Sequence, residues 1–248
     1  MSTSTFRDNL LTGQVALVSG GTSGIGAAIG DALADCGAVV TVTGATAAEA
    51  EAARGRPDFG GRDALSLDVR DMAAIRALIA NLPRLDVVVN AAGMIRRDAE
   101  HDPEVFADVV DVNLTGAMRL CTVARPLLAK SRGCIVNIAS ILAFFGGARV
   151  PGYSASKGGL AQLTKSLAIA YAQDRIRVNA IAPGWIATAL TQALQDDHER
   201  SAAILARTPL GRWGVPGDVA GTVLFLCSPA AEFVTGAVIP VDGGYLAA

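Results

Sequence analysis

Two kinds of apolar segment alternate along the chain. Short runs rich in Val and Ile predict buried strands, and longer stretches with apolar positions every three or four residues predict helices. The predicted strands cover residues 15–19, 39–43, 64–67, 85–89, 134–139, 176–181 and 237–241. The predicted helices cover residues 24–36, 47–54, 72–81, 103–131 and 153–173.

This alternation indicates the fold class. Near-continuous apolar strands that alternate with helices are typical of a parallel sheet covered on both faces. Because crossovers between parallel strands are right-handed, the sheet becomes doubly wound. We predict an α/β fold in which residues 1–248 form a single Rossmann-type domain, with a sheet of about seven strands and helices on both faces. A polar helical segment around residues 187–210 is predicted to be a small substrate lid.

Composition and charge narrow the function classes. Hydrophobic residues make up 51% of the chain and charged residues 18%, which predicts a large packed core. The net charge of −2, without a basic run, argues against a nucleic-acid partner. No stretch approaches the roughly 20 apolar residues of a membrane helix, and residues 1–11 lack the layout of a signal peptide. We expect a cytoplasmic protein without membrane association, whose four scattered cysteines are free thiols.

Histidine chemistry is nearly excluded. The chain has only two histidines, His101 and His198, both in polar surroundings. No cluster of His, Cys, Asp and Glu has the spacing of catalytic metal ligands, so we expect no metal. Acid/base chemistry therefore has to use another side chain.

A glycine-rich turn follows the first predicted strand and opens a helix. Glycines there permit a tight turn, close approach of a pyrophosphate and close helix packing, and the helix N-terminus attracts the phosphates. The strand–turn–helix context makes this a dinucleotide-binding motif rather than an ordinary loop. Its candidate cofactor-binding residues are Gly20, Thr22, Ser23, Gly24, Ile25 and Gly26.

The residues at the end of the second strand do not decide between NAD and NADP. An acid at this position would bond the 2′-hydroxyl of NAD, and an arginine would favour NADP. The chain has Thr43-Gly44-Ala45-Thr46, with neither. The cofactor is therefore NAD or NADP with a slight preference for NAD, because a 2′-phosphate would lack an evident cationic partner. Gly44 is included among the candidate cofactor contacts.

Tyr153 and Lys157 form the candidate acid/base pair. Four residues apart on a helix, they lie on one face. A tyrosine with a pKa of about 10 is a poor base at pH 7, and a nearby ammonium group would lower that pKa. Ser140 and the segment Asn90-Ala91-Ala92-Gly93 follow two further strands at the same sheet edge, where doubly wound folds bind ligands. Asn113 falls within the predicted long helix between them.

Together these motifs resemble the short-chain dehydrogenase/reductase family, from about Thr12 to the C-terminus. Ser19 replaces the Thr of the family's glycine motif, and Ala91 replaces the second Asn of its Asn-Asn-Ala-Gly motif. The family's catalytic tetrad falls on Asn113, Ser140, Tyr153 and Lys157. The resemblance further implies cofactor contacts from Asp68, Val69, Asn90, Ala91, Gly93, Tyr153, Lys157, Pro183, Gly184, Ile186 and Thr188, and a homotetramer.

The resemblance implies a role for each tetrad residue. Ser140 would donate a hydrogen bond to the reacting oxygen, and Tyr153 would exchange a proton with it. Lys157 would bond the nicotinamide ribose and lower the pKa of Tyr153. Asn113 would hold a water that links Lys157 to solvent. The cofactor would carry the hydride.

Arginines near the reacting centre predict a carboxylated substrate. Arg96 follows the Gly93 segment and Arg149 precedes Tyr153, so the two could clamp a carboxylate, with Trp185 as a further substrate contact. The surrounding stretches are similar to those of 2-deoxy-D-gluconate 3-dehydrogenases and uronate-pathway reductases. The predicted function is thus interconversion of a secondary alcohol and a ketone on a sugar acid of the 2-deoxy-gluconate or keto-deoxy-uronate type.

Two alternatives stay open. A 3-oxoacyl-[acyl-carrier-protein] reductase would use the same catalytic groups and need a basic docking patch, for which Lys130, Arg132, Arg175 and Arg177 are candidates. A more remote alternative is a catalytically silent NAD(P)-binding regulatory protein. Such a protein would be expected to lack one of the catalytic Ser, Tyr and Lys side chains, and all three are present.

Overall fold

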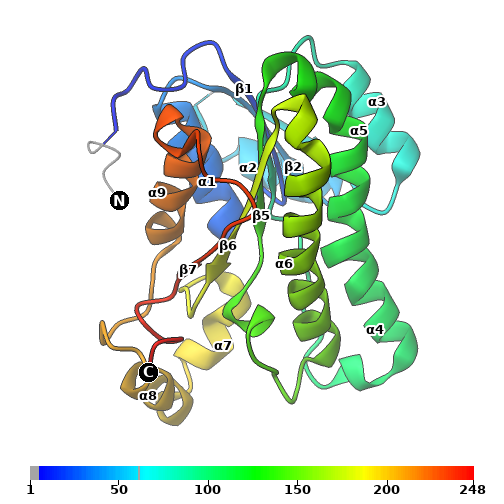
Figure 1. The fold of residues 1–248 in the computed structure, drawn as a ribbon. Coiled ribbons are helices and arrows are strands. Elements are labelled where there is room, and N and C mark those ends of the chain that lie inside the picture. Colours follow the sequence, from blue (N-terminus) through cyan, green and yellow to red (C-terminus); the bar gives the residue numbers. More distant parts are fainter. Residues whose placement is uncertain (1–5, 61) are drawn as a thin grey trace.

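A seven-stranded parallel sheet forms the centre of the molecule (Figure 1). The structure is a computed structural model and describes residues 6–60 and 62–248. The strand order is β3-β2-β1-β4-β5-β6-β7, and every neighbouring pair is parallel. The strands are β1 Val15–Ser19, β2 Val39–Gly44, β3 Asp63–Ser66, β4 Val87–Asn90, β5 Cys134–Ile138, β6 Arg177–Pro183 and β7 Val238–Val241. This order confirms the predicted doubly wound α/β fold.

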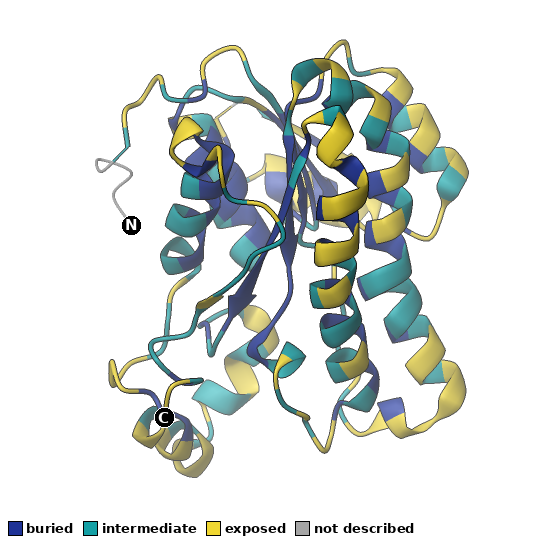
Figure 2. Ribbon diagram, viewed as in Figure 1, coloured by how far each residue is buried: buried dark blue, intermediate teal, exposed yellow. Residues whose placement is uncertain are grey.

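The continuous apolar character of the strands follows from their two buried faces. Ala16 and Val18 of β1 pack into one hydrophobic core, whereas Leu17 between them packs into the other. In β4, Val87 and Val89 likewise face the first core. Side chains alternate across a strand, so a sheet covered on both sides needs an apolar residue at every position. Figure 2 shows the result as dark central strands between helices with exposed outer surfaces.

Helices cover both faces of the sheet (Figure 1). The first core contains side chains of α1 Gly24–Asp35, α2 Ala47–Arg54 and α9 Pro216–Cys227. The second contains side chains of α3 Met72–Ala80, α5 Gly116–Ser131 and α6 Pro151–Tyr171. Two buried layers of this kind hold the carboxyl ends of the strands in fixed positions.

Two features differ from the sequence-based prediction. The helix α9 was not predicted, because its Ala-, Val- and Leu-rich sequence is apolar on more than one face and lacks a clear helical period. The predicted single helix over 103–131 is divided into α4 Pro103–Val110, a π-helical turn Asp111–Thr115 and α5. Such turns insert an extra residue into a helix and are frequent at functional sites.

The predicted lid segment is helical and lies beyond the carboxyl ends of the strands (lower left in Figure 1). It consists of a short 3₁₀ turn Ala189–Thr191, α7 Gln192–Gln195 and α8 His198–Ala206. The other 3₁₀ turns are Ala99–His101, Ile141–Ala143, Ala172–Asp174 and Pro229–Ala231. Within residues 6–60 and 62–248, no helix combines the length and apolar character needed to cross a membrane.

Candidate active site

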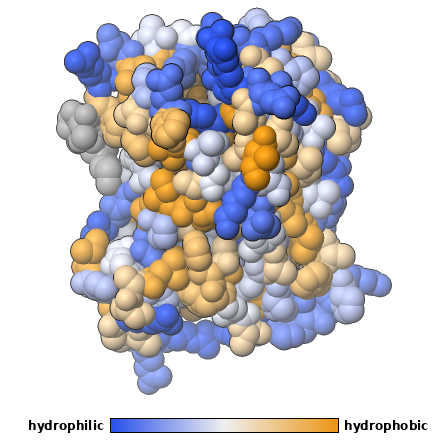
Figure 3. All heavy atoms as spheres, viewed as in Figure 1, coloured by the Kyte–Doolittle hydropathy of each residue, from blue (hydrophilic) through white to orange (hydrophobic). Residues whose placement is uncertain are grey.

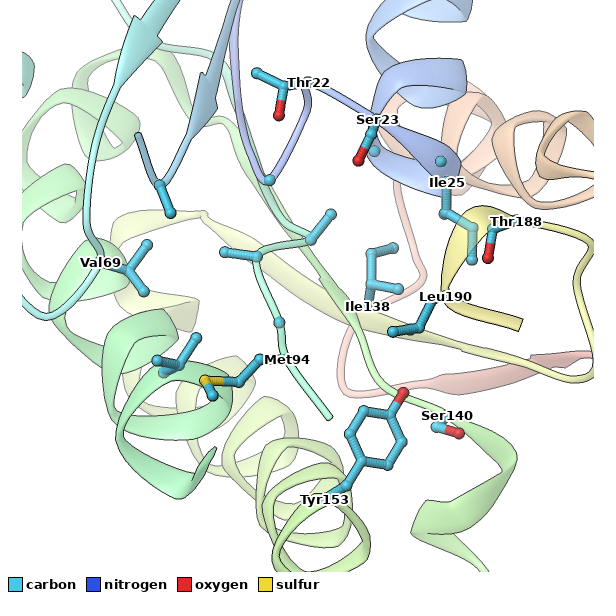
Figure 4. Close-up of a pocket in the computed structure, with 18 of the residues that line it drawn as sticks. Thr22, Ser23, Ile25, Val69, Met94, Ile138, Ser140, Tyr153, Thr188 and Leu190 are labelled. Atoms are coloured by element: carbon cyan, nitrogen blue, oxygen red, sulfur yellow. The ribbon is translucent and has the colours of Figure 1, made fainter. Parts of the chain in front are cut away.

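A cavity of about 640 Å³ lies at the carboxyl edge of the sheet. The strand order reverses between β1 and β4, and this switch point is where doubly wound sheets bind ligands. Thr22 and Ser23 line one end of the cavity, and Ser140 and Tyr153 line the other (Figure 4). Predicted cofactor residues that line it are Gly20, Thr22, Ser23, Gly24, Ile25, Gly26, Asp68, Val69, Ala91, Gly93, Tyr153, Lys157, Pro183, Gly184, Ile186 and Thr188.

The glycine turn has the form that a pyrophosphate requires. A Cβ on Gly26 would lie 2.1 Å from the Gly20 carbonyl oxygen, so only glycine allows the helix to pack this closely on the turn. Ser23 precedes α1, and its side chain makes no capping hydrogen bond, which leaves the first N–H groups of the helix without that partner. Free N–H groups at a helix N-terminus favour an anion. The cavity and turn therefore fit a nicotinamide dinucleotide.

Two predicted cofactor contacts lie beneath the cavity instead of lining it. Asn90 is buried, and its Nδ2 donates to Asn137 Oδ1 at 2.8 Å, so this side chain joins β4 to β5. Gly44 is also buried, and Glu49 covers it. Neither residue is among those that line the cavity.

Tyr153 and Ser140 meet at one end of the cavity. Pro151 occupies the first turn of α6, which places Tyr153 near the helix N-terminus. Its hydroxyl points toward the Ser140 side chain (Figure 4). Burial raises the pKa of Tyr153, and so does the charge of Glu100, while a hydrogen bond with Ser140 and the charge of Arg97 act in the opposite direction. Ser140 Oγ also accepts the Leu142 N–H at 3.1 Å.

Lys157 faces the same cavity, one turn along α6. Its Nζ lies 5.5 Å from the centroid of the Tyr153 ring and donates to the Ile138 carbonyl at 2.6 Å. Burial lowers the pKa of Lys157 to about 8. In the absence of coenzyme, burial thus keeps the pKa of Tyr153 raised, with the charge of Arg97 acting against it. The expected lowering by Lys157 stays a prediction.

Asn113 lies in the π-helical turn and is buried behind the cavity. Its Oδ1 accepts the Met94 N–H at 2.8 Å, and its Nδ2 donates to the Met94 carbonyl at 2.9 Å and to Ser156 Oγ at 3.1 Å. The predicted water relay would have to share a side chain that is already engaged in three hydrogen bonds. Its evident role in the structure is to fix the segment after Gly93 against α6.

A second cavity of about 460 Å³ adjoins the first at Ser140 and Tyr153. Three arginines line it, Arg97, Arg149 and Arg200, and most of the remaining side chains are apolar. Trp185 lies in the wall and makes edge contacts with Trp213 and Tyr245. The larger apolar side chains lining this cavity are Ile95, Ile141, Leu142, Phe145, Val150, Trp185, Leu190 and Leu194.

Comparisons with known proteins agree with this geometry. Residues 13–246 match a family model described as enoyl-(acyl carrier protein) reductase. A 2-dehydro-3-deoxy-D-gluconate 5-dehydrogenase from Pseudoalteromonas atlantica is 44% identical over 95% of this chain and 97% of its own. The chain belongs to the short-chain dehydrogenase/reductase family. It is an NAD(P)-dependent oxidoreductase that acts on CH–OH groups.

Two further relatives of this dehydrogenase are informative. A cis-4-hydroxycyclohexanecarboxylate dehydrogenase from Sinomonas cyclohexanicum is 41% identical over 94% of this chain and 97% of its own. The structure of a gluconate 5-dehydrogenase from Burkholderia cenocepacia, in complex with NADP and tartrate, is 34% identical. It superposes with a TM-score of 0.90 over 97% of this chain and 98% of that one.

The arginines of the dehydrogenase are arranged differently from the predicted clamp. Arg96 lines the first cavity, not the second. Arg149 does line the second cavity, but both arms of its guanidinium bind Asp98, with Nε 2.7 Å from Oδ1. Arg97, the neighbour of Arg96 in the same sequence segment, lines the second cavity, and no ion pair engages it within the described residues. Arg200 of α8 also lines this cavity and pairs with Asp197 at 3.3 Å.

Sequence reasoning missed two acidic residues. Glu100 is buried, and its two oxygens accept the Arg96 and Tyr153 N–H groups, each at 2.7 Å. The contact with Arg96 is local, four residues away, but the contact with Tyr153 spans 53 positions and is made only by the fold. Glu49 lines the first cavity, and its position three residues after the helix cap Thr46 is the only local signal. No group of three or more potential metal ligands gathers among residues 6–60 and 62–248.

Proposed function

We propose that this dehydrogenase interconverts a secondary alcohol and a ketone on a carboxylated sugar, of the 2-deoxy-gluconate or keto-deoxy-uronate type. The observation that carries the proposal is the position of Arg97, an arginine outside any ion pair in the described residues, in the cavity that Ser140 and Tyr153 share. A guanidinium without a carboxylate partner is suited to bind the carboxylate of a substrate. The sugar-acid names of two relatives support the same substrate class.

The tetrad residues would act on the reacting oxygen. A bound nicotinamide coenzyme would supply the hydride acceptor or donor. Ser140 donates a hydrogen bond to the substrate oxygen, and the Tyr153 hydroxyl oxygen takes the proton when the alcohol is oxidised and returns it when the ketone is reduced. Lys157, mostly protonated at pH 7, stabilises negative charge on Tyr153 and offers its amine to the nicotinamide ribose.

Other residues would hold these groups in place. Asn113 fixes the Met94 segment, and a water on its remaining lone pair could still connect Lys157 with solvent. Glu100 fixes the Tyr153 backbone and the Arg96 backbone at once. Leu190 and Arg200 belong to the segment proposed as a lid, and both line the second cavity. Arg97 Nη1 donates to the Leu190 carbonyl at 3.5 Å, so the proposed carboxylate site lies against the lid.

A second candidate substrate is an alicyclic hydroxy acid. Most side chains of the second cavity are apolar, so several hydroxyls of an open sugar acid would lose water without gaining partners there. A ring bearing one hydroxyl and one carboxylate would satisfy both the apolar wall and Arg97. The Sinomonas cyclohexanicum relative is named for such a substrate.

The acyl-carrier alternative is less favoured. Of its candidate docking residues, Arg132 lies just before β5 and Arg175 just before β6, and Arg177 is the first residue of β6. Lys130 lies in the last turn of α5, which leads into β5. All four therefore lie at the amino ends of the strands, whereas the cavities lie at the carboxyl ends. A carrier docked there would lie at the end of the sheet opposite to the cavity that Tyr153 lines.

The test is an initial-rate screen of sugar acids, 4-hydroxycyclohexanecarboxylate and acetoacetyl thioester with both coenzymes. We expect the highest kcat/KM with a sugar acid. Arg97→Ala should raise KM for that substrate by about tenfold or more, since a charge-assisted hydrogen bond is lost, whereas Arg149→Ala, which removes an arginine already bound to Asp98, should change it less. A higher kcat/KM with the cyclohexane acid would select the second candidate, and an unchanged KM in Arg97→Ala would refute the role of Arg97 in binding the carboxylate.

A further inference from the structure

Two aromatic side chains in the wall of the second cavity pack against the same tyrosine. Phe145 and Trp185 both line this cavity. The ring of Tyr245 stacks on Phe145, with centroids 6.0 Å apart and planes inclined by 30°, and meets Trp185 edge to face, with centroids 6.2 Å apart. Tyr245 lies in the segment after β7, is 8% exposed and is not among the residues that line either cavity. Its ring therefore forms a layer behind the cavity wall.

The orientation of Trp185 depends on such aromatic contacts. Its indole Nε1 is buried and has no hydrogen-bond partner among residues 6–60 and 62–248. The other aromatic neighbour is Trp213, edge to face with centroids 6.1 Å apart. Trp213 is itself fixed, since its Nε1 donates to Ser201 Oγ of α8 at 2.9 Å. Because no hydrogen bond orients the Trp185 indole, packing against Tyr245 and Trp213 holds its ring in the wall.

Hydrogen bonds fix the segment that carries Tyr245. The Asp242 carboxylate accepts the N–H groups of Gly244 and Leu246, each at 2.9 Å. The Gly184 N–H donates to the Val241 carbonyl at 3.0 Å, which joins the end of β7 to the chain directly before Trp185. Segments outside regular elements are well ordered where such contacts tie them down. Tyr245 is thus a rigid support for the cavity wall.

The proposed lid meets the same tyrosine. Arg207 is the C-cap residue of α8, and its guanidinium carbon lies 4.4 Å from the centroid of the Tyr245 ring and 5.6 Å from that of Phe145. A cation above an aromatic face is attracted by the negative charge of that face. Tyr245 therefore contacts two residues of the cavity wall and the end of the lid helix at once.

We propose that Tyr245 is a positioning residue of the substrate site. Its ring holds Phe145 and Trp185 in the wall against which the carbon skeleton of the substrate packs, while Arg97 binds the substrate carboxylate. The inference rests on the proposed function, because it takes the second cavity as the substrate site. Removal of the ring would leave a space behind the wall. Both aromatic side chains would turn into this space, and the substrate would lose apolar contacts.

The test compares Tyr245→Leu with Tyr245→Phe, using the substrate that the initial-rate screen selects. Tyr245→Leu keeps an apolar side chain but removes the ring. We expect it to raise KM for that substrate about three- to tenfold, the loss that a missing aromatic pair predicts, while kcat changes less. Tyr245→Phe keeps both ring contacts and should retain the wild-type KM.

Near-ultraviolet circular dichroism gives a second readout that needs no substrate. The chain has two tryptophans, Trp185 and Trp213, and both belong to this aromatic cluster. Tyr245→Leu should therefore change the tryptophan signal of the free protein, and Tyr245→Phe should preserve it. Leu246→Ala is the matched control in the same segment, because Leu246 is not among the residues that line either cavity. It should change neither KM nor the tryptophan signal.

Titration with NADH and NADPH shows whether each variant is folded, since Tyr245 is not among the residues that line the first cavity. Coenzyme affinity should stay close to that of the wild type. If Tyr245→Leu loses coenzyme binding, Arg207→Ala takes its place. This variant removes only the exposed cation above the ring. It should raise KM about two- to fivefold.

The outcomes separate this inference from the proposed function. An unchanged KM or an unchanged tryptophan signal in the folded variant would overturn the role of Tyr245, and so would an equal effect of Leu246→Ala. If Tyr245→Leu raises KM but Arg97→Ala does not, the role of Tyr245 stands and the carboxylate site is wrong. If only Arg97→Ala raises KM, the carboxylate site stands and the inference about Tyr245 fails.

Discussion

At the scale of single residues, Tyr153 is the group on which the proposed chemistry depends. Its hydroxyl lies at the junction of the two cavities, beside Ser140, and its ring packs in the α6 wall. Burial raises the pKa of Tyr153 in the absence of coenzyme. The residue would therefore act as a base only when positive charge gathers near it, and Lys157 and Arg97 are the protein's contribution to that charge.

Removing this hydroxyl should separate binding from catalysis. Tyr153→Phe keeps the ring, so we expect coenzyme affinity close to that of the wild type and a kcat lower by about two orders of magnitude or more. Tyr171→Phe on the same helix serves as control, since Tyr171 packs in the core against Arg125 and should retain activity. Retention of more than about a tenth of kcat by Tyr153→Phe would contradict the assignment.

Residue identity in the site was predictable where a short motif carried it. The glycine turn, Ser140, Tyr153 and Lys157 stand at fixed spacings or at strand ends, and all of them line the first cavity. Contacts that depend on long-range packing were not predictable: Glu100 meets Tyr153 from 53 positions away. The sequence showed that arginines cluster near the site. It did not show that Asp98 neutralises Arg149, or that Arg97 stays outside any ion pair in the described residues.

At the scale of elements, the start of α6 is tied to the loop after β4 by one buried carboxylate. Glu100 accepts N–H groups from Arg96 and from Tyr153. These bonds satisfy an N–H at the start of the helix and set the distance between the two walls of the site. Glu100 is thus a positioning residue that also acts on Tyr153 electrostatically, since its charge helps to raise the pKa of that hydroxyl.

Glu100→Gln should change both stability and pH dependence. An amide places an NH₂ group against one of the two N–H donors, so we expect a loss of about 1–3 kcal/mol in the free energy of unfolding. Loss of the negative charge lowers the pKa of Tyr153, which must be deprotonated to accept a proton. The rising limb of kcat/KM against pH for alcohol oxidation should therefore move to lower pH. Glu104→Gln, at an exposed position of α4, should show neither effect, and a limb that stays in place in Glu100→Gln would contradict the electrostatic role.

The elements that were predicted and those that were missed differ in how they are buried. All seven strands were predicted to within three residues, because an uninterrupted Val- and Ile-rich run between turn residues has few other interpretations. Helix α9 was missed because it packs along α1 and on the sheet, which removes the polar face that marks an ordinary surface helix. The π-helical turn was missed because the insertion of one residue leaves no compositional trace around Asn113.

At the scale of the whole molecule, apolar surface remains after the two cores are filled. Figure 3 shows apolar residues gathered on one face, in the region of the edge strand β7 between α9 and α6. Large hydrophobic side chains stay exposed on these elements, with Ile169 of α6 at 80% and Phe233 shortly before β7 at 104% relative exposure. Exposed apolar patches of this kind commonly mark protein–protein contacts, and an edge strand is a surface that a second copy can cover.

We therefore propose that this face is one interface of an assembly of four copies, and predict a mass near four times 25.3 kDa in sedimentation at micromolar concentration. Ile169→Glu should reduce the mass, because a charge buried in a subunit interface is not compensated. Leu65→Glu is the comparison, since Leu65 is 42% exposed on β3, at the opposite edge of the sheet, and its substitution should leave the assembly intact. A wild-type protein that sediments as a monomer would contradict the assembly. If both variants lost the assembly, the loss would reflect general destabilisation of the subunit. The proposal that the β7 face holds the copies together would then be contradicted.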